Sequence, residues 1–244
     1  MRRTTSALLS LSALLTASAL AAPAAGAAPH NDRAAGASAS GAFADGVPAG
    51  WEKVDEADLA RITGASDRQK SLSASGRSTS GPSASGPSAS APADESGPVA
   101  IKSVRNGKFT ATEVNYAAPH TGALRARSTQ VLGAWESFAF EWDEAGDTFA
   151  IKSLANNRYV AVEKNFTGQA QNVLRARSTT AGGWERFVIY HNEDLNLYAL
   201  RSTLNNLFVA MENSYTGPLQ YTLRARSADV TGSWEQFDLY SIVG

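Results

Sequence analysis

The motif Phe149-Ala-Ile-Lys-Ser153 is followed by three more in a fixed order: Arg158-Tyr-Val-Ala-Val-Glu163, Leu174-Arg-Ala-Arg-Ser178 and Trp184-Glu-Arg-Phe187. The same set occurs once before, from Val99 to Phe138, and once after, from Tyr198 to Phe237. The copies are about 49–50 residues apart, and a period of this size indicates a repeat architecture. Three copies of one motif set supply three similar surfaces, which favours binding over catalysis.

Each repeat is expected to form four short strands. In the first motif Phe149, Ile151 and Ser153 share one face, and this alternation is typical of a half-buried strand. The turn that follows is predicted to be tight, because asparagine and glycine favour it: Asn106-Gly107, Asn156-Asn157 and Asn205-Asn206. The last strand of each repeat alternates apolar residues that we assign to the core: Phe138 and Phe140, Phe187 and Ile189, Phe237 and Leu239.

Three units of four strands restrict the architecture. A propeller typically has about four to eight blades, and an open solenoid usually ends in atypical capping repeats, whereas these three copies are nearly equal. A closed, threefold-symmetric barrel of about twelve strands fits best. The sequence therefore predicts an all-β fold with three four-stranded repeats at about 98–147, 148–196 and 197–244.

The repeats resemble those of the fascin-like β-trefoil family. An apolar-x-apolar start, an Asn-Gly-type turn, a Tyr/Phe-Val-Ala-x-Glu second strand and a closing Trp-Glu-x-Phe all occur here three times, within 98–241. The resemblance implies a β-trefoil of the actin-crosslinking-like kind at 98–244. Animal fascins carry several trefoils and bundle actin in the cytoplasm, whereas this chain has one repeat set. It is more similar to a secreted bacterial relative and to β-trefoil modules that bind polysaccharides.

The N-terminal residues 1–27 have the features of a Sec-type secretory signal peptide. Arg2 and Arg3 supply positive charge, Ala7–Leu20 is an apolar segment, and Ala25-Gly26-Ala27 is a small-residue cleavage signal. Secretion to the extracellular medium is therefore expected. No later apolar run is long enough to span a bilayer, so membrane insertion is not expected.

Residues 28–97 are predicted to form a low-complexity linker rich in Ser, Gly, Pro and Ala, because this composition buries too little apolar area to fold. Within it, Asp55 can cap a short helix over 55–63 that stops at Gly64. Two interpretations stay open for this part. It is either a docking peptide containing Trp51 or a transient helix in a tether, since isolated helices this short are marginal.

The composition excludes several classes of function. The chain has a net charge of −1 and no cysteine. A nearly neutral chain gives no electrostatic reason to expect nucleic acid, and without Cys or His clusters neither a metal nor another cofactor is expected. His30, His120 and His191 occupy unlike positions, and no Ser/His/Asp arrangement recurs. No catalytic residue is therefore predicted and the chain is expected not to be an enzyme, although a carboxylate pair would support a small hydrolase.

The closing motifs supply the first candidate ligand-binding residues. An aromatic face can stack on the apolar face of a sugar ring, and an adjacent carboxylate can accept hydrogen bonds from sugar hydroxyls. Here each tryptophan directly precedes a glutamate: Trp135-Glu136, Trp184-Glu185 and Trp234-Glu235. In the alternative interpretation the indoles plug one end of the barrel and the glutamates hold turn amides.

The second strands supply the other candidates. Each ends in a glutamate that is followed by an aromatic residue in a glycine-containing loop: Glu113 and Tyr116, Glu163 and Phe166, Glu212 and Tyr215. These pairs can form sugar sites, or each glutamate can pair with an arginine of the next strand. Those arginines (Arg125/Arg127, Arg175/Arg177 and Arg224/Arg226) can recognise acidic polymers, but balanced charges favour internal pairing.

Together these features predict a secreted, non-catalytic lectin, a monomer that binds an extracellular polysaccharide at up to three pseudo-equivalent sites. Three weak sites on one rigid barrel would gain avidity on a polymer. The competing hypothesis is a fascin-like protein-interaction or structural module that contacts a filament or a cell-surface protein.

Overall fold

The structure, a computed structural model, describes residues 47–62 and 97–242. The predicted signal peptide and most of the predicted linker lie outside the described residues. The described ranges contain thirteen strands, one α-helix and three 3₁₀ helices. None of their helices has the length and apolar character needed to cross a membrane.

The elements follow the order of the sequence repeats. An N-terminal segment, defined here as residues 47–62, contains β1 (Glu52–Lys53) and α1 (Glu56–Ile62). The first repeat supplies β2 (Val99–Ser103), β3 (Phe109–Glu113), β4 (Ala123–Ser128), η1 (Ala134–Glu136) and β5 (Phe138–Asp143). The second supplies β6 (Thr148–Ser153), β7 (Arg158–Val162), η2 (Gly168–Ala170), β8 (Leu174–Ser178) and β9 (Arg186–Asn192). The third supplies β10 (Leu197–Ser202), β11 (Phe208–Met211), η3 (Gly217–Leu219), β12 (Leu223–Ser227) and β13 (Phe237–Ser241).

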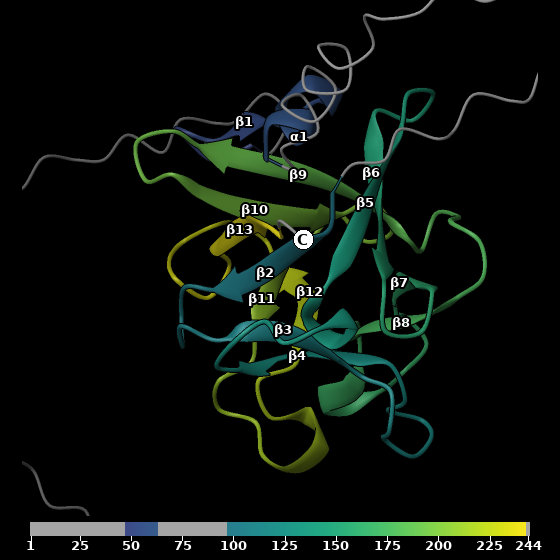
Figure 1. Cartoon of the computed structure of the whole chain (residues 1–244). Helices are drawn as coiled ribbons and strands as arrows, with labels where there is room; N and C mark the ends of the chain where they lie inside the picture. Colours follow the sequence, from purple (N-terminus) through teal and green to yellow (C-terminus); the bar gives the residue numbers. More distant parts are fainter. Residues whose placement is uncertain (1–46, 63–96, 243–244) are drawn as a thin grey trace, which may run out of the picture. The chain divides into compact units, whose positions relative to one another are not determined.

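The strands form a closed antiparallel barrel with additional strands attached (Figure 1). Pairing runs from β9 through β6, β7, β8, β4, β3, β2, β13 and β10 and returns to β9, so nine strands close the ring. β5 lies off this path and pairs with β2 and β6, while β11 and β12 extend from β10. β1 pairs with Tyr190 and His191 of β9, beyond the residues of β9 that pair with β6.

The prediction of a β-trefoil with three four-stranded repeats is wrong, although the all-β class is correct. The first repeat contributes three strands to the ring, the second four and the third two. The repeats meet at three equivalent bridges: Ala123 with Arg175, Thr222 with Arg125 and Val173 with Arg224. Only the first joins two strands, β4 and β8, because Val173 and Thr222 lie just before β8 and β12. β12 pairs with β11 but reaches the first two repeats only through the isolated bridges, so β11 and β12 stay outside the ring.

The core consists of the residues that the alternation assigns to it. Phe138, Phe140, Phe187, Ile189 and Phe237 are each at most 1% exposed, and they belong to one hydrophobic cluster. Leu239 is only partly buried against that cluster. The repeated period-2 pattern therefore places the inward face of the last strands correctly.

The expected tight turns are present, and their asparagines do more than permit the turn. Gly107, Asn157 and Asn206 take positive φ angles of 66, 56 and 60°. The preceding asparagine of each turn donates its side-chain amide to a carbonyl of the third strand: Asn106 to Ala126 at 2.8 Å, Asn156 to Ala176 at 2.8 Å and Asn205 to Ala225 at 2.9 Å. Each asparagine thus joins the turn to a strand further along its repeat.

The N-terminal segment packs against the barrel. β1 pairs with β9, and the Val54 N–H donates to the Ile189 carbonyl at 2.9 Å. Trp51, Val54 and Leu59 are 7%, 1% and 2% exposed. Asp55 caps α1, because its carboxylate accepts the Asp58 N–H at 2.9 Å. The predicted short helix is therefore present, and the segment that contains it is docked on β9.

Tyr159 is expected to keep its proton to unusually high pH. Its hydroxyl donates to a Glu141 oxygen at 2.6 Å, and this hydrogen bond, helped by burial, raises the pKa of Tyr159 to about 12. Because the folded-state pKa lies above the unfolded value of 10.0, the stabilisation is complete below pH 10.0 and disappears as the pH rises through about 12.

An ultraviolet difference titration can check this expectation. Glu141→Gln should move the titration of Tyr159 toward its ordinary pKa, and Tyr159→Phe identifies which part of the absorbance change belongs to this phenol. Identical titrations of the parent chain and Glu141→Gln would contradict the assigned cause.

Candidate functional site

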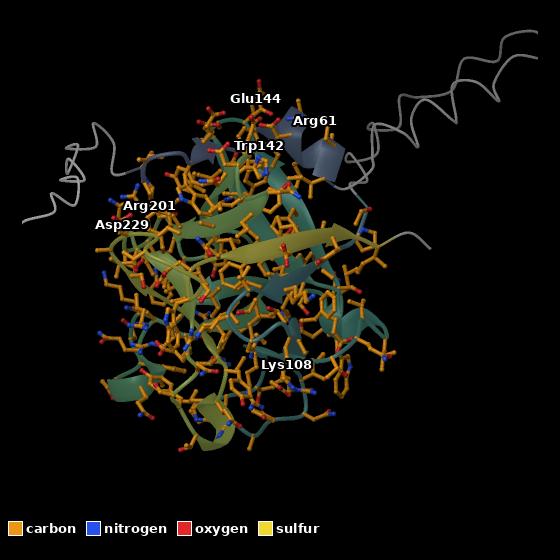
Figure 2. All side chains as sticks on the ribbon, turned by 90° about the vertical axis from the view of Figure 1, so that its left-hand side faces the viewer. Arg61, Lys108, Trp142, Glu144, Arg201 and Asp229 are labelled. Atoms are coloured by element: carbon orange, nitrogen blue, oxygen red, sulfur yellow. The ribbon has the colours of Figure 1, made fainter. Side chains whose placement is uncertain are left out.

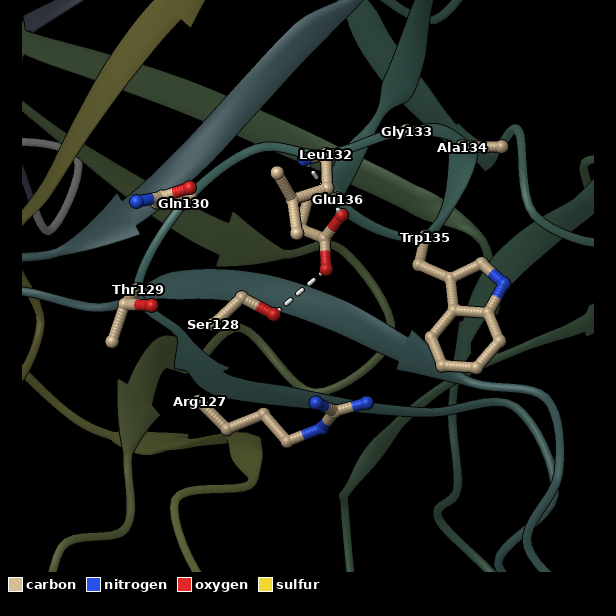
Figure 3. A pocket seen from close by; sticks show the side chains of 9 residues that line it. All are labelled: Arg127, Ser128, Thr129, Gln130, Leu132, Gly133, Ala134, Trp135 and Glu136. Atoms are coloured by element: carbon tan, nitrogen blue, oxygen red, sulfur yellow. Dashed lines mark hydrogen bonds between the residues drawn. The ribbon is translucent and has the colours of Figure 1, made fainter.

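A shallow depression of about 630 Å³ lies beside Trp135. The indole is 40% exposed and the neighbouring Leu132 is 83% exposed. In Figure 3 the indole lies at one end of the depression and the side chains of Thr129 and Gln130 lie at the other. The depression thus combines an apolar ring face with polar side chains, which is the combination that a hydroxylated ring can use.

The glutamates that follow the tryptophans are buried under their loops. Glu136, Glu185 and Glu235 are 6%, 6% and 4% exposed. Each accepts a hydrogen bond from a serine hydroxyl: Ser128 at 2.7 Å, Ser178 at 2.5 Å and Ser227 at 2.7 Å. The second oxygens of Glu136 and Glu185 accept the N–H groups of Leu132 and Gly182 at 3.4 and 2.9 Å. These two carboxylates therefore hold the loops that carry the tryptophans.

All three tryptophans lie outside the hydrophobic core clusters, and each faces a guanidinium group. Trp135 is exposed, whereas Trp184 and Trp234 are half-buried. The distances from guanidinium carbon to ring centroid are 6.0 Å for Arg127 and Trp135, 5.6 Å for Arg177 and Trp184, and 4.2 Å for Arg105 and Trp234. Cation–π contact therefore accompanies each indole at the surface.

The glutamates of the second strands form buried ion pairs. Glu113, Glu163 and Glu212 are 4%, 4% and 3% exposed. The inner arginine of each motif lies at 3.0–3.2 Å: Arg125, Arg175 and Arg224. The outer arginine of each motif (Arg127, Arg177 and Arg226) contacts the same carboxylate through Nε. The hydrogen bond to Glu113 raises the pKa of Arg127, whereas burial lowers the pKa of Arg175.

The inner arginines also connect different repeats. The Nε of each donates to a backbone carbonyl in another repeat: Arg125 to Gln220 at 2.6 Å, Arg175 to Thr121 at 2.9 Å and Arg224 to Gln171 at 2.7 Å. The motif alone did not indicate these bonds, because the acceptors are carbonyls of loops that differ in sequence. The inner arginines thus act within and between repeats.

The aromatic residues predicted beside these glutamates lie over the inner arginines. Guanidinium carbons lie 5.5–5.6 Å from the rings of Tyr116, Phe166 and Tyr215. The hydroxyls of Tyr116 and Tyr215 also accept hydrogen bonds from Arg125 and Arg224. This second set of candidate residues is therefore joined into three internal Glu–Arg–aromatic clusters. In the first two repeats the outer arginine, Arg127 or Arg177, links the glutamate of the cluster to a tryptophan.

Sequence reasoning missed several residues around the tryptophans. Thr129, Gln130 and Leu132 line the depression beside Trp135, but their loop differs between the copies. Arg105 belongs to a turn distant in sequence from Trp234, and no repeated motif includes it. A further depression of about 410 Å³ between the N-terminal segment and the β9–β10 hairpin includes His191 and Tyr198. Only the docking of the N-terminal segment creates it.

Comparison with known proteins adds information on the fold alone. No family model and no curated protein matches this chain. The solved structures similar to it are β-trefoil-like proteins. The designed 3-fold symmetric protein ThreeFoil has 15% identity and a TM-score of 0.48, over 59% of this chain and 99% of that one. A mosquitocidal holotoxin has 11% identity and a TM-score of 0.50, over 60% of this chain and 17% of that one.

The GlcNAcα1-4Gal releasing endo-β-galactosidase from Clostridium perfringens has 10% identity and a TM-score of 0.47, over 60% of this chain and 33% of that one. The chain thus spans 33% or less of the length of the galactosidase and the holotoxin. At such identities a shared fold does not carry function with it. The fold is all-β and trefoil-like, with the unequal strand pairing described above.

Proposed function

We propose that this chain is a secreted, non-catalytic module that binds an extracellular polysaccharide through its tryptophan sites. The observation that carries the proposal is the 40% exposed indole of Trp135 beside a depression of about 630 Å³. A sugar ring would place its apolar face on the indole and its hydroxyls near Thr129 and Gln130. Glu136 would position the loop from beneath.

The state of the carboxylate supports binding without turnover. Glycoside hydrolysis uses two carboxyl groups that flank the scissile bond. Glu136 is 6% exposed, and its two oxygens accept hydrogen bonds from Ser128 and from the Leu132 N–H. Its geometry is that of a support for the loop rather than of an acid or nucleophile facing a substrate.

The three sites are expected to be unequal. The loop between Ser178 and Trp184 is one residue shorter than the loop between Ser128 and Trp135. Trp184 and Trp234 are half-buried, whereas Trp135 is exposed. The site of Trp135 should therefore contribute most to binding, and the other two should add avidity on a polymer that reaches two sites at once.

One observation favours a second candidate function, the binding of a protein partner. Leu132, Trp135 and Leu154 are large hydrophobic residues that are 83%, 40% and 40% exposed. They lie in one region, because the Leu154 N–H donates to the Ser137 carbonyl at 3.0 Å, close to the Trp135 loop. An exposed apolar patch with an aromatic anchor is typical of protein interfaces.

Affinity electrophoresis of the full chain through gels with β-glucans, xylan, chitin derivatives, galactans or acidic polysaccharides tests the proposal. Trp135→Ala should weaken binding about tenfold, which corresponds to about 1.4 kcal/mol. Trp184→Ala and Trp234→Ala should have smaller effects, because those indoles are less accessible.

The matched control is Tyr240→Ala, which removes a 44% exposed aromatic ring elsewhere on the barrel and should leave the retardation unchanged. Absence of retardation on every polymer would contradict the proposal. So would a folded Trp135→Ala variant that migrates like the parent chain.

A further inference from the structure

Each tryptophan loop contacts the first turn of another repeat. Three backbone hydrogen bonds join them: Leu154 N–H to the Ser137 carbonyl at 3.0 Å, Thr203 N–H to Arg186 at 3.1 Å and Val104 N–H to Gln236 at 3.1 Å. The residue after each donor therefore occupies the corresponding position beside a tryptophan site. It is Ala155 for Trp135, Leu204 for Trp184 and Arg105 for Trp234. Only the third site receives a charge from this turn.

The guanidinium of Arg105 lies 4.2 Å from the centroid of the Trp234 ring. The arginines beside the other two indoles, Arg127 and Arg177, are both paired with a buried glutamate. Among the residues that the structure describes, Arg105 has no carboxylate within ion-pair distance. It therefore offers an uncompensated, exposed cation on an aromatic surface.

Glu235 also differs from its two counterparts. It is 4% exposed, and its Oε2 is buried without a hydrogen-bond partner in the described part of the chain. The corresponding oxygens of Glu136 and Glu185 accept loop N–H groups. An unpaired buried acceptor is unfavourable, so a donor that reaches it is favoured. Glu235 therefore gives its loop one hydrogen bond fewer than Glu136 and Glu185 give theirs.

We infer that the third tryptophan site, formed by Trp234, Arg105 and Glu235, recognises a negatively charged sugar unit, a uronate or a sulfated residue. This inference rests on the proposed function. The anionic group pairs with the two-pronged guanidinium of Arg105 while the ring stacks on Trp234. A sugar hydroxyl donates to the free oxygen of Glu235 once the loop over it adjusts. The site of Trp135, which faces Ala155, takes neutral sugar.

Two other charges act near this site. Asp229 lies exposed in the same loop (Figure 2), and its carboxylate accepts the Val230 N–H at 2.8 Å. It opposes an incoming anion, so Asp229→Asn should strengthen binding of an acidic polymer. Arg226 is paired with Glu212 at 2.6 Å, whereas Arg105 has no ion pair among the described residues.

The test uses the full chain carrying Trp135→Ala, which removes the first site. The probes are polygalacturonate and the same polymer after methyl esterification, with dextran sulfate and dextran as the second pair. Adding Arg105→Ala should weaken binding of at least one acidic polymer about tenfold and remove its dependence on salt. Arg105→Lys should retain part of the affinity, because it keeps the charge and loses the planar fork.

The outcomes separate this inference from the proposed function. Unchanged or stronger binding of acidic polymers by Arg105→Ala would overturn the inference. Arg105 would then either make no contact with the ligand or block access of the ligand to Trp234. A parent chain that binds neutral polymers and neither acidic polymer would overturn it while the proposed function stands. A parent chain that binds no polymer would overturn both. The preferred acidic probe decides between carboxylate and sulfate.

Discussion

Replacing Glu113 by glutamine is expected to lower the free energy of unfolding by about 3–5 kcal/mol, the usual effect of breaking a buried ion pair on one side. Glu113 is 4% exposed and pairs with Arg125 at 3.2 Å and with Arg127. The Arg125 side chain is itself only 9% exposed. The glutamine has nearly the same shape, so the loss would come from a buried guanidinium without its counter-charge.

Urea unfolding followed by tryptophan fluorescence measures this change, provided that the dependence on urea stays the same. The matched control is Asp147→Asn, which makes the same carboxylate-to-amide change in a surface ion pair with Lys53. The Asp147 side chain is 62% exposed, so its loss should change stability by no more than about 1 kcal/mol. Equal effects of the two substitutions would show that the buried cluster does not stabilise the barrel.

Leu59→Ala is expected to destabilise the protein by about 2–5 kcal/mol, the usual range for removing a buried leucine side chain. Leu59 is 2% exposed and belongs to the same hydrophobic cluster as Val54 and the phenylalanines of the barrel. α1 spans only seven residues, too few to be stable alone, so its packing holds it in place. The N-terminal segment would therefore open before the barrel unfolds.

Limited trypsin digestion reports this opening directly, since Arg61 lies exposed on α1 (Figure 2). Cleavage there should be faster in Leu59→Ala than in the parent chain. The control Leu195→Ala removes a leucine side chain that is 53% exposed and should change stability by no more than about 0.5 kcal/mol. A Leu59→Ala variant as stable as this control would contradict the prediction. The N-terminal segment would then be a tether that adds no stability to the barrel.

The repeated strands were predictable because their signal is local. Phe138, Phe187 and Phe237 recur at equivalent positions, and alternation assigns each to the interior, where the structure has them. The unequal contribution of the three repeats to the ring could not be predicted in the same way. The three repeats meet at equivalent bridges, but only the bridge of Ala123 with Arg175 joins two strands, and this depends on where each strand begins rather than on a motif residue.

The N-terminal segment shows a second limit of prediction from the sequence. Trp51, Val54 and Leu59 are few apolar residues in a polar stretch, and taken alone they indicate a marginal helix. Their burial depends on the edge of β9, which is distant in sequence and carries no signal near them. A local pattern predicts the helix but not the surface that stabilises it.

Prediction of the candidate site from the sequence was limited by a turn that precedes the last strand of the first repeat. Alternation from Phe138 back to Trp135 predicts the direction of the indole only if the strand continues, and η1 at Ala134–Glu136 interrupts it. The burial of Glu136 follows from this turn, which directs the carboxylate toward Ser128. The residue types of the motif were therefore informative, whereas their division into an exposed tryptophan and a buried glutamate follows from the turn at η1, which the motif does not encode.

The inner arginines make the three repeats depend on one another. Arg125 donates to the third repeat, Arg224 to the second and Arg175 to the first, so the three bonds form a cycle. A peptide of one repeat would lack the carbonyl that its own arginine needs. Removal of any one repeat would leave an arginine of another repeat without its acceptor, so no repeat is expected to be dispensable.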